Sequence, residues 1–127
     1  MLFRSDAWEP VLWWVFPLGA VLGLSLHLGN QAPDVLEDRR AGVRGVAQRI
    51  GARRATGLAI GLFGGVCSTA VVLLLMRSPV HALFAAVDGA SVALLAPRAP
   101  VFFGRDGLFG LLAAASAVLA VIFLLAV

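Results

Sequence analysis

Hydrophobic residues fill four long runs of this 127-residue chain, and the segments between the runs hold most of its charge. The runs cover residues 11–28, 56–76, 80–96 and 108–127. Each is close to the ~20 predominantly apolar residues that a helix needs to cross a bilayer. The pattern therefore predicts an all-α integral membrane protein, a single domain built as a bundle of about four transmembrane helices. A polar segment, residues 29–55, follows the first helix.

Aromatic and hydroxyl residues indicate where the first two helices begin. Trp8, Trp13 and Trp14 lie at the start of the first run, where they resemble the aromatic belt found at membrane surfaces. Thr56 opens the second run, and we expect its side chain to cap that helix by accepting a hydrogen bond from a free backbone N–H. The second helix is therefore expected to begin only after the polar segment.

Small residues form a stripe in the second run. Gly57, Gly61 and Gly65 recur at intervals of four residues, which puts them on one face of a helix. Such a stripe lets a neighbouring backbone approach closely, so we expect this face to pack against another helix. Cys67, the single cysteine, has no disulfide partner in the chain, and we expect it to pack as a small hydrophobic side chain.

Asp88 is the one acidic residue inside a predicted span. A carboxylate near the middle of a bilayer is costly, so a residue of this kind is a candidate for function. Three structural explanations stand beside the functional one. The span is shifted, or the carboxylate is satisfied by His81, or it is satisfied by an arginine of a neighbouring helix.

Composition supports the membrane assignment and narrows the choice of ligands. Hydrophobic residues make up 61% of the chain and charged residues 13%, with a mean hydropathy of +0.96, which excludes an ordinary soluble domain. The net charge is +3, but the positive residues lie beside apolar runs, so we do not expect a nucleic-acid partner. All ten basic residues are arginines, and the planar guanidinium group suits phosphate.

The arginines also predict an orientation. Six lie in the segment between the first and second runs, and two lie between the third and fourth, at Arg98 and Arg105. The N-terminal lead and the remaining turn carry one each, Arg4 and Arg77. Because cytoplasmic loops are enriched in basic residues, we expect the polar segment to face the cytoplasm and both termini to lie outside.

The polar segment carries a possible ligand stripe. If the first helix continues beyond its apolar run, five side chains fall within about 100° of its circumference: His27, Asn30, Asp34, Glu37 and Asp38. Asn30, Asp34 and Asp38 follow one another at four-residue intervals, so their oxygens could bracket a hard cation. Pro33 is expected to kink or restart the helix just before Asp34.

Two interpretations of this segment follow from its residue types. Oxygen ligands without a converging set of His and Cys favour Mg²⁺, which is often held by one or two carboxylates together with substrate phosphates. The arginines that follow would then neutralise the phosphate oxygens. Alternatively, the segment is a solvated loop whose arginines anchor anionic lipid headgroups.

Two members of the stripe have alternatives of their own. We expect His27 to be a buried, hydrogen-bonded histidine, with orientation of Asn30 or Asp34 as the alternative. Glu37 either binds the metal through water or pairs with an arginine of the same segment, Arg40 or Arg44.

The amino-acid sequence of the segment resembles the second aspartate-rich motif of the UbiA family of membrane prenyltransferases. The residues that carry the resemblance are Asn30-x-x-Pro33-Asp34-x-x-Glu37-Asp38-Arg39, then Gly42-Val43-Arg44-Gly45 and Arg49-Ile50-Gly51. In that family two such motifs face each other across about nine helices and hold Mg²⁺ on an isoprenyl diphosphate. The allylic cation formed on ionisation is captured by a lipid-soluble acceptor.

The resemblance implies a function and roles for five residues. It implies Mg²⁺-dependent transfer of an isoprenyl group from a prenyl diphosphate, in a bacterial cell membrane. Asn30, Asp34 and Asp38 would be metal ligands, and Arg39 and Arg44 would contact the diphosphate. No catalytic residue beyond the metal ligands is assigned.

The chain departs from the family in its length. Its four predicted spans correspond to the last four of the family's nine, and it contains no earlier NxxxD or DxxxD stretch. We therefore expect a truncated member or a C-terminal half that works with a missing N-terminal half or another helical membrane subunit. The alternative is a non-catalytic membrane helix bundle, either a degenerate remnant or an assembly partner that associates through the face of Gly57, Gly61 and Gly65.

Overall fold

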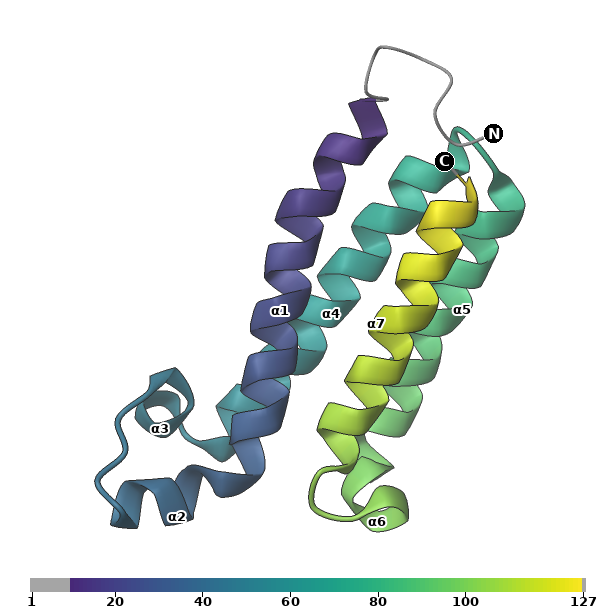
Figure 1. The fold of residues 1–127 in the computed structure, drawn as a ribbon. Helices are drawn as coiled ribbons and strands as arrows, with labels where there is room; N and C mark the ends of the chain where they lie inside the picture. Colours follow the sequence, from purple (N-terminus) through teal and green to yellow (C-terminus); the bar gives the residue numbers. More distant parts are fainter. Residues whose placement is uncertain (1–9, 127) are drawn as a thin grey trace.

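Four long helices form the body of the molecule in the computed structural model, which describes residues 10–126 (Figure 1). They run alternately in opposite directions along the chain. They are α1 (Val15–Gln31), α4 (Ala52–Leu75), α5 (Pro79–Leu95) and α7 (Gly107–Ala126). The described part of the chain contains no β-strand, which confirms the all-α prediction.

Six short helical elements precede or connect the long helices. They are η1 (Pro10–Trp14), η2 (Ala32–Asp34), α2 (Val35–Arg40), α3 (Val46–Ile50), η3 (Ala96–Arg98) and α6 (Ala99–Phe103). Most of the connection between α1 and α4 is thus helical rather than an open loop. The position of this connection was predicted correctly, but the predicted segment, residues 29–55, is too long. α1 continues to Gln31 and α4 already begins at Ala52.

Three helical segments are long and apolar enough to cross a membrane. They are Ala52–Leu75, Pro79–Phe103 and Gly107–Ala126. α1 is shorter, at 17 residues, although η1 extends it at its start. Three of the four predicted spans therefore meet this criterion, and a crossing by α1 stays a prediction.

The start of α4 corrects the prediction for Thr56. The helix begins at Ala52, and the residue before it, Gly51, has φ +89° and ψ 156° and makes no side-chain capping bond. Only glycine adopts this backbone conformation readily. Gly51 therefore ends α3 and starts α4 by its conformation, and Thr56 lies inside the helix.

The four long helices enclose a narrow core. α4 packs against α1 and α5, and α7 packs against the other sides of α1 and α5. Small buried residues such as Ala59 and Ala85 allow the helices to approach closely. Two glycines permit close contacts between the long helices, because a Cβ on Gly29 would lie 2.9 Å from Leu112 Cδ1 and one on Gly89 would lie 2.9 Å from Cys67 Cβ. Cys67 itself is buried in this core, as predicted.

The glycine stripe of α4 is not part of this core. Gly57, Gly61 and Gly65 are exposed, and a Cβ added to any of them would meet nothing within 4 Å. The helix turns its other face, which includes Ala59 and Phe63, toward its neighbours. Packing of the stripe against another helix is therefore not found within residues 10–126.

Large hydrophobic side chains cover much of the outside of the bundle. Only 33%, 22% and 28% of the apolar windows in the three candidate spans are buried. Phe84, Leu94 and Leu125 are each more than half exposed. A surface this apolar requires lipid or another apolar partner, because water would cover it at a large cost in free energy.

Two polar residues of the long helices differ from expectation. His27 is exposed, so the prediction of a buried histidine is wrong. Asp88 is half-buried, and its Oδ2 atom has no hydrogen-bond partner among the described residues. His81, expected as one possible partner for Asp88, instead lies with Nδ1 2.6 Å from the hydroxyl oxygen of Ser78.

Candidate functional site

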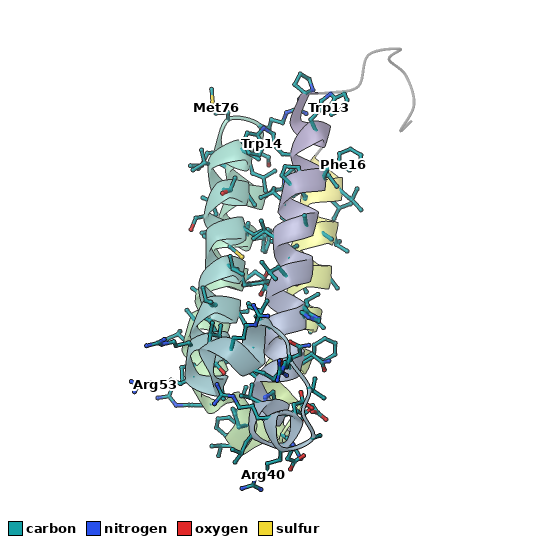
Figure 2. All side chains as sticks on the ribbon, turned by 90° about the vertical axis from the view of Figure 1, so that its left-hand side faces the viewer. Trp13, Trp14, Phe16, Arg40, Arg53 and Met76 are labelled. Carbon is teal, nitrogen blue, oxygen red and sulfur yellow. The ribbon has the colours of Figure 1, made fainter. Side chains whose placement is uncertain are left out.

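The polar residues gather at one end of the bundle. Figure 2 shows Arg40 and Arg53 at this end, whereas Trp13, Trp14 and Met76 lie at the other. The elements from η2 to α3 lie at the charged end, and so do α6 and the turn that follows it (Figure 1). Trp8 and Arg4, which were also assigned to the opposite end, lie outside the described residues. The two arginine-rich connections thus share one side of the molecule, as the predicted orientation requires.

The predicted ligand stripe is interrupted at Pro33. α1 ends at Gln31, a 3-10 turn contains Pro33, and α2 begins at Val35 in a new direction. The predicted interruption at Pro33 is confirmed and follows from the missing N–H of proline, but α2 restarts directly after Asp34 rather than before it. Asn30 therefore lies in the last turn of α1, where it is exposed, whereas Asp38 lies in α2.

Asp34 and Glu37 converge on a single cation. Nη2 of Arg105, in the turn between α6 and α7, donates to Asp34 Oδ1 at 2.5 Å and to Glu37 Oε2 at 2.8 Å. The expected pairing of Glu37 with Arg40 or Arg44 is therefore replaced by one with a residue 68 positions away. The hydrogen bond and charge of Glu37, followed by the charge of Asp34, raise the pKa of Arg105 above its ordinary value.

Asp38 has a different partner, which ties α2 to α3. Its Oδ2 accepts a hydrogen bond of 2.6 Å from Nε2 of Gln48. The backbone carbonyl of Gln48 in turn accepts a bond of 2.6 Å from Nε of Arg39. One residue of α3 therefore holds both the carboxylate and the guanidinium that end the aspartate motif.

Glycine makes room for Gln48, which is buried with a relative exposure of 3%. A Cβ on Gly45 would lie 2.5 Å from Gln48 Oε1. Gly42, at the turn after α2, has φ +79°, which is a conformation that favours glycine. The Gly-x-Arg-Gly turn thus serves to bend the chain and to seat Gln48 beneath it.

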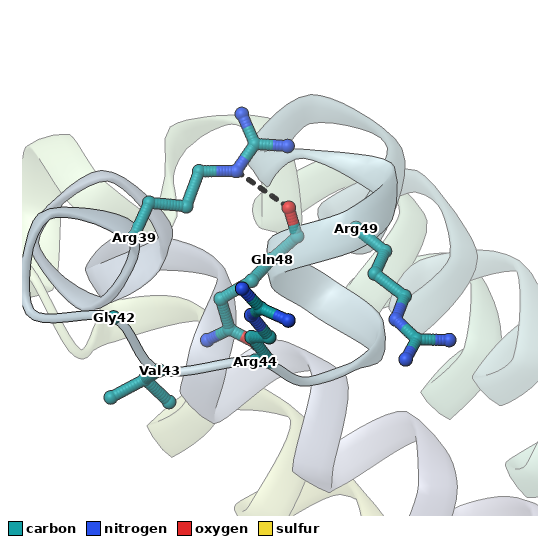
Figure 3. Close-up of a pocket in the computed structure, with 6 residues that line it drawn as sticks. All are labelled: Arg39, Gly42, Val43, Arg44, Gln48 and Arg49. Carbon is teal, nitrogen blue, oxygen red and sulfur yellow. Dashed lines mark hydrogen bonds between the residues drawn. The ribbon is translucent and has the colours of Figure 1, made fainter.

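A hollow of about 360 Å³ lies beside the hydrogen bonds that join Gln48 to Arg39 and Asp38 (Figure 3). Its lining residues are Arg39, Gly42, Val43, Arg44, Gln48 and Arg49. The three arginines come from α2, from the turn and from α3, and no acidic residue lines the hollow. Three arginines line one opening, and guanidinium groups carry positive charge and N–H donors that suit phosphate oxygens.

The structure brings some of the predicted ligands together and not others. Arg39 and Arg44 share the hollow, while Asp34 is paired with Glu37 through Arg105. Within residues 10–126, no group of three or more His, Cys, Asp and Glu side chains is placed to hold a metal ion. The structure therefore brings Asp34 and Glu37 to one cation, Arg105, whereas Asn30 and Asp38 are not part of this contact.

Sequence reasoning missed two residues of the site. Gln48 is a neutral amide in a segment crowded with charges, and only its burial reveals its importance. Arg105 was counted in the orientation argument but was given no contact, because its partners lie 68 and 71 positions away. The placement of both arginine-rich connections on one side was the signal that could have suggested such a contact.

Comparison of the chain with protein-family models, with curated proteins and with solved structures finds no match.

Proposed function

We propose that this chain is the C-terminal part of a UbiA-like prenyltransferase that transfers an isoprenyl group from a prenyl diphosphate to a lipid-soluble acceptor. The observation that carries the proposal is the hollow lined by Arg39, Arg44 and Arg49. It adjoins the aspartate motif, because Gln48 holds Arg39 and Asp38 together. A cationic pocket next to carboxylates, at the end of an apolar helix bundle, suits a ligand with a charged head and an apolar tail.

The chain's own residues divide the work of binding the diphosphate. The arginines of the hollow bind phosphate oxygens and stabilise the negative charge that grows on the diphosphate as the bond to the isoprenyl carbon breaks. Asn30, Asp34 and Asp38 would hold Mg²⁺, with Glu37 beside them. The metal would neutralise phosphate oxygens that the arginines do not reach.

The chain would form this site with further helices in the membrane. A bundle whose three candidate spans leave most of their apolar windows exposed encloses too little space for an isoprenyl tail. A second aspartate-rich half, or another helical subunit, would complete both the metal site and the cavity. The charged end, with eight of the ten arginines, would face the cytoplasm of a bacterial cell, and α1 would serve as the fourth span.

Binding of a labelled prenyl diphosphate to the chain in detergent tests the proposal. Arg39→Gln and Arg44→Gln are each expected to weaken binding about tenfold, because a charge-assisted hydrogen bond contributes roughly 1.5–3 kcal/mol. Arg98→Gln is the matched control, since Arg98 lies at the same end but donates to the carbonyl of Leu94 at the end of the preceding helix, α5. The proposal would be refuted if neither Arg39→Gln nor Arg44→Gln weakened binding and Mg²⁺ did not strengthen it.

A second candidate is a non-catalytic bundle that assembles through α4. It is favoured by the exposed stripe of Gly57, Gly61 and Gly65 and by a groove of about 420 Å³ between α4 and α5. The groove is lined by Gly64, Cys67, Ser68, Val71, Ala86, Gly89 and Ala90. If this candidate is right, Gly61→Leu lowers association of the chain in detergent cross-linking, and prenyl diphosphate does not bind.

A further inference from the structure

The short helix α6 carries apolar side chains that the bundle does not cover. Val101, Phe102 and Phe103 follow one another in the sequence and are 82%, 65% and 64% exposed. The rings of Phe102 and Phe103 meet edge to face with their centroids 6.4 Å apart, an arrangement that aromatic rings favour. These three side chains therefore form one apolar surface, which we call the α6 projection.

Close packing holds the base of the α6 projection in place. Ala99, at the start of α6, is fully buried, and α6 packs against α7. A Cβ on Gly107 would lie 2.4 Å from the backbone oxygen of Ala99 and 2.9 Å from Phe103 Cβ. α6 approaches α7 this closely because Gly107 has no side chain. The projection is thus presented by a helix that is fixed to the bundle.

The position of α6 along the bundle matches the edge of a hydrocarbon layer. α5 has 17 residues, so at 1.5 Å per residue it is about 26 Å long, against ~30 Å for the layer. α6 follows α5 after the three residues of η3, and Figure 1 shows it at the foot of the bundle, below the ends of α5 and α7. A layer crossed by α5 therefore ends near η3 and α6.

The surroundings of the α6 projection are positively charged. Residues 32–55 and 96–106, which form the charged end, contain eight arginines and four acidic residues, a net charge of about +4 at neutral pH. Arg40, Arg44 and Arg53 are exposed there. Apolar side chains next to exposed cations match an anionic lipid surface, in which acyl chains lie directly beneath phosphate groups.

The size of the α6 projection favours lipid over a protein partner. A specific protein interface buries about 800 Å² on each partner. Two phenylalanines and one valine fall short of this area, because even an aromatic side chain buries only about 150–250 Å². The apolar surface also continues onto the last turn of α5, where Leu94 and Leu95 are exposed. A bilayer covers both parts of this surface at once.

We propose that α6 is an interfacial anchor, whose Val101, Phe102 and Phe103 enter the edge of the hydrocarbon layer of an anionic bilayer while the arginines of the charged end attract its phosphates. The inference goes beyond the proposed function, because none of these three residues lines the arginine hollow. It places α6 at the membrane surface, although the whole segment Pro79–Phe103 is long and apolar enough to cross a membrane.

Spin labels on the full chain in lipid vesicles test the depth of α6. Phe102→Cys, Val87→Cys in α5 and Arg40→Cys at the end of α2 each provide one exposed attachment point. The native Cys67 is buried, and the unmodified chain reports its background labelling. Collisions with oxygen, which dissolves in hydrocarbon, are compared with collisions with a water-soluble nickel chelate. The ratio of oxygen to chelate collisions is expected to be highest at Val87, about threefold lower at Phe102 and about tenfold lower at Arg40, because interfacial side chains lie only about 5–10 Å below the surface.

Three other results would each overturn the inference. A ratio at Phe102 equal to that at Arg40 would place α6 in water. A ratio equal to that at Val87 would place α6 inside the hydrocarbon layer as the end of a long span. Rare collisions with both reagents would show that protein, such as a second copy of the chain or another subunit, covers the projection. Val101→Cys, at the most exposed of the three positions, repeats the measurement at a second site.

The lipid composition of the vesicles tests the part played by charge. Replacing about a third of the phosphatidylcholine by phosphatidylglycerol is expected to lower chelate collisions at Phe102 about twofold, because an anionic surface draws the arginines toward its phosphates. The label at Val87, which lies within the layer in either case, is the control and should show no change. Equal chelate collisions at Phe102 in both kinds of vesicle would overturn the preference for anionic lipid.

Discussion

The two ends of the bundle are built in different ways. At the charged end, side-chain hydrogen bonds join residues 10, 68 and 71 positions apart. At the opposite end, the hydrogen bond between the side chains of Ser78 and His81 lies at the start of α5, and the rings of Trp13 and Phe16 also meet locally. The hydrogen bonds of the charged end thus connect distant segments, whereas these contacts of the opposite end lie within one segment.

The middle of the bundle depends mainly on close packing, with alanine and glycine where the helices approach each other. It also contains one buried hydrogen bond between helices, from Ser25 Oγ to the carbonyl of Ala59 at 2.7 Å. The charged end depends on hydrogen bonds between specific side chains. Substitutions in the middle should therefore destabilise the protein mainly by disturbing packing, and substitutions at the charged end by removing hydrogen bonds.

The largest effect is expected at Gly107, where the charged end meets the bundle. A Cβ here would lie 2.4 Å from the backbone oxygen of Ala99, which cannot move aside as a flexible side chain does. Gly107→Ala is expected to lower the free energy of unfolding by about 2–3 kcal/mol. Thermal unfolding in detergent measures this effect.

Gly110→Ala provides the matched control in the same helix, because a Cβ there meets nothing within 4 Å. Alanine at this position should leave stability unchanged or raise it by up to about 1 kcal/mol, since it favours the helix. Equal effects of the two substitutions would show that close approach at Gly107 does not matter.

A smaller effect is expected at Gln48, and it should be confined to the charged end. Gln48→Ala leaves Asp38 without its donor and unties α2 from α3, at a cost of about 1–3 kcal/mol. Faster hydrogen exchange over residues 35–50, with little change in α5 and α7, is the expected result. Arg49→Ala removes an exposed neighbour and serves as the control. Equal exchange in both variants would contradict the role assigned to Gln48.

The smallest effect is expected in the middle of the bundle. Ser25→Ala removes the one hydrogen bond to Ala59 and should cost about 0.5–1.5 kcal/mol in unfolding free energy. Ser91→Ala is the comparison, because its hydroxyl is exposed and donates to Val87 in its own helix. If Ser91→Ala lowered the free energy of unfolding as much as Ser25→Ala, the buried hydrogen bond between α1 and α4 would contribute no more to stability than an exposed one.

Local features of the sequence predicted the fold well where one residue or one run decides the structure. The apolar runs located the long helices, and Pro33 marked the break between α1 and α2. Thr56 misled because a good capping side chain lay near a glycine whose backbone freedom mattered more. His27 misled because it continues an apolar run but lies on a face that the other helices leave open.

Contacts across the bundle were beyond this reasoning. The pairing of Arg105 with Asp34 and Glu37 depends on which helix ends meet, which depends in turn on the packing of α1, α5 and α7. The buried position of the Gln48 side chain depends on the turn at Gly45, which has no Cβ to obstruct it. In both cases the residue types were visible in the sequence, but the geometry that gives them a role was not.

The first turn of α4 has a consequence for how this helix would fit a bilayer. α4 has 24 residues, and Arg53 and Arg54 lie in its first turn. The apolar part that follows, residues 55–75, is roughly 32 Å long at 1.5 Å per residue, close to the ~30 Å of a typical hydrocarbon layer. A helix whose apolar part matches the layer needs little tilt, and the two arginines at its foot would then lie at the level of the lipid headgroups.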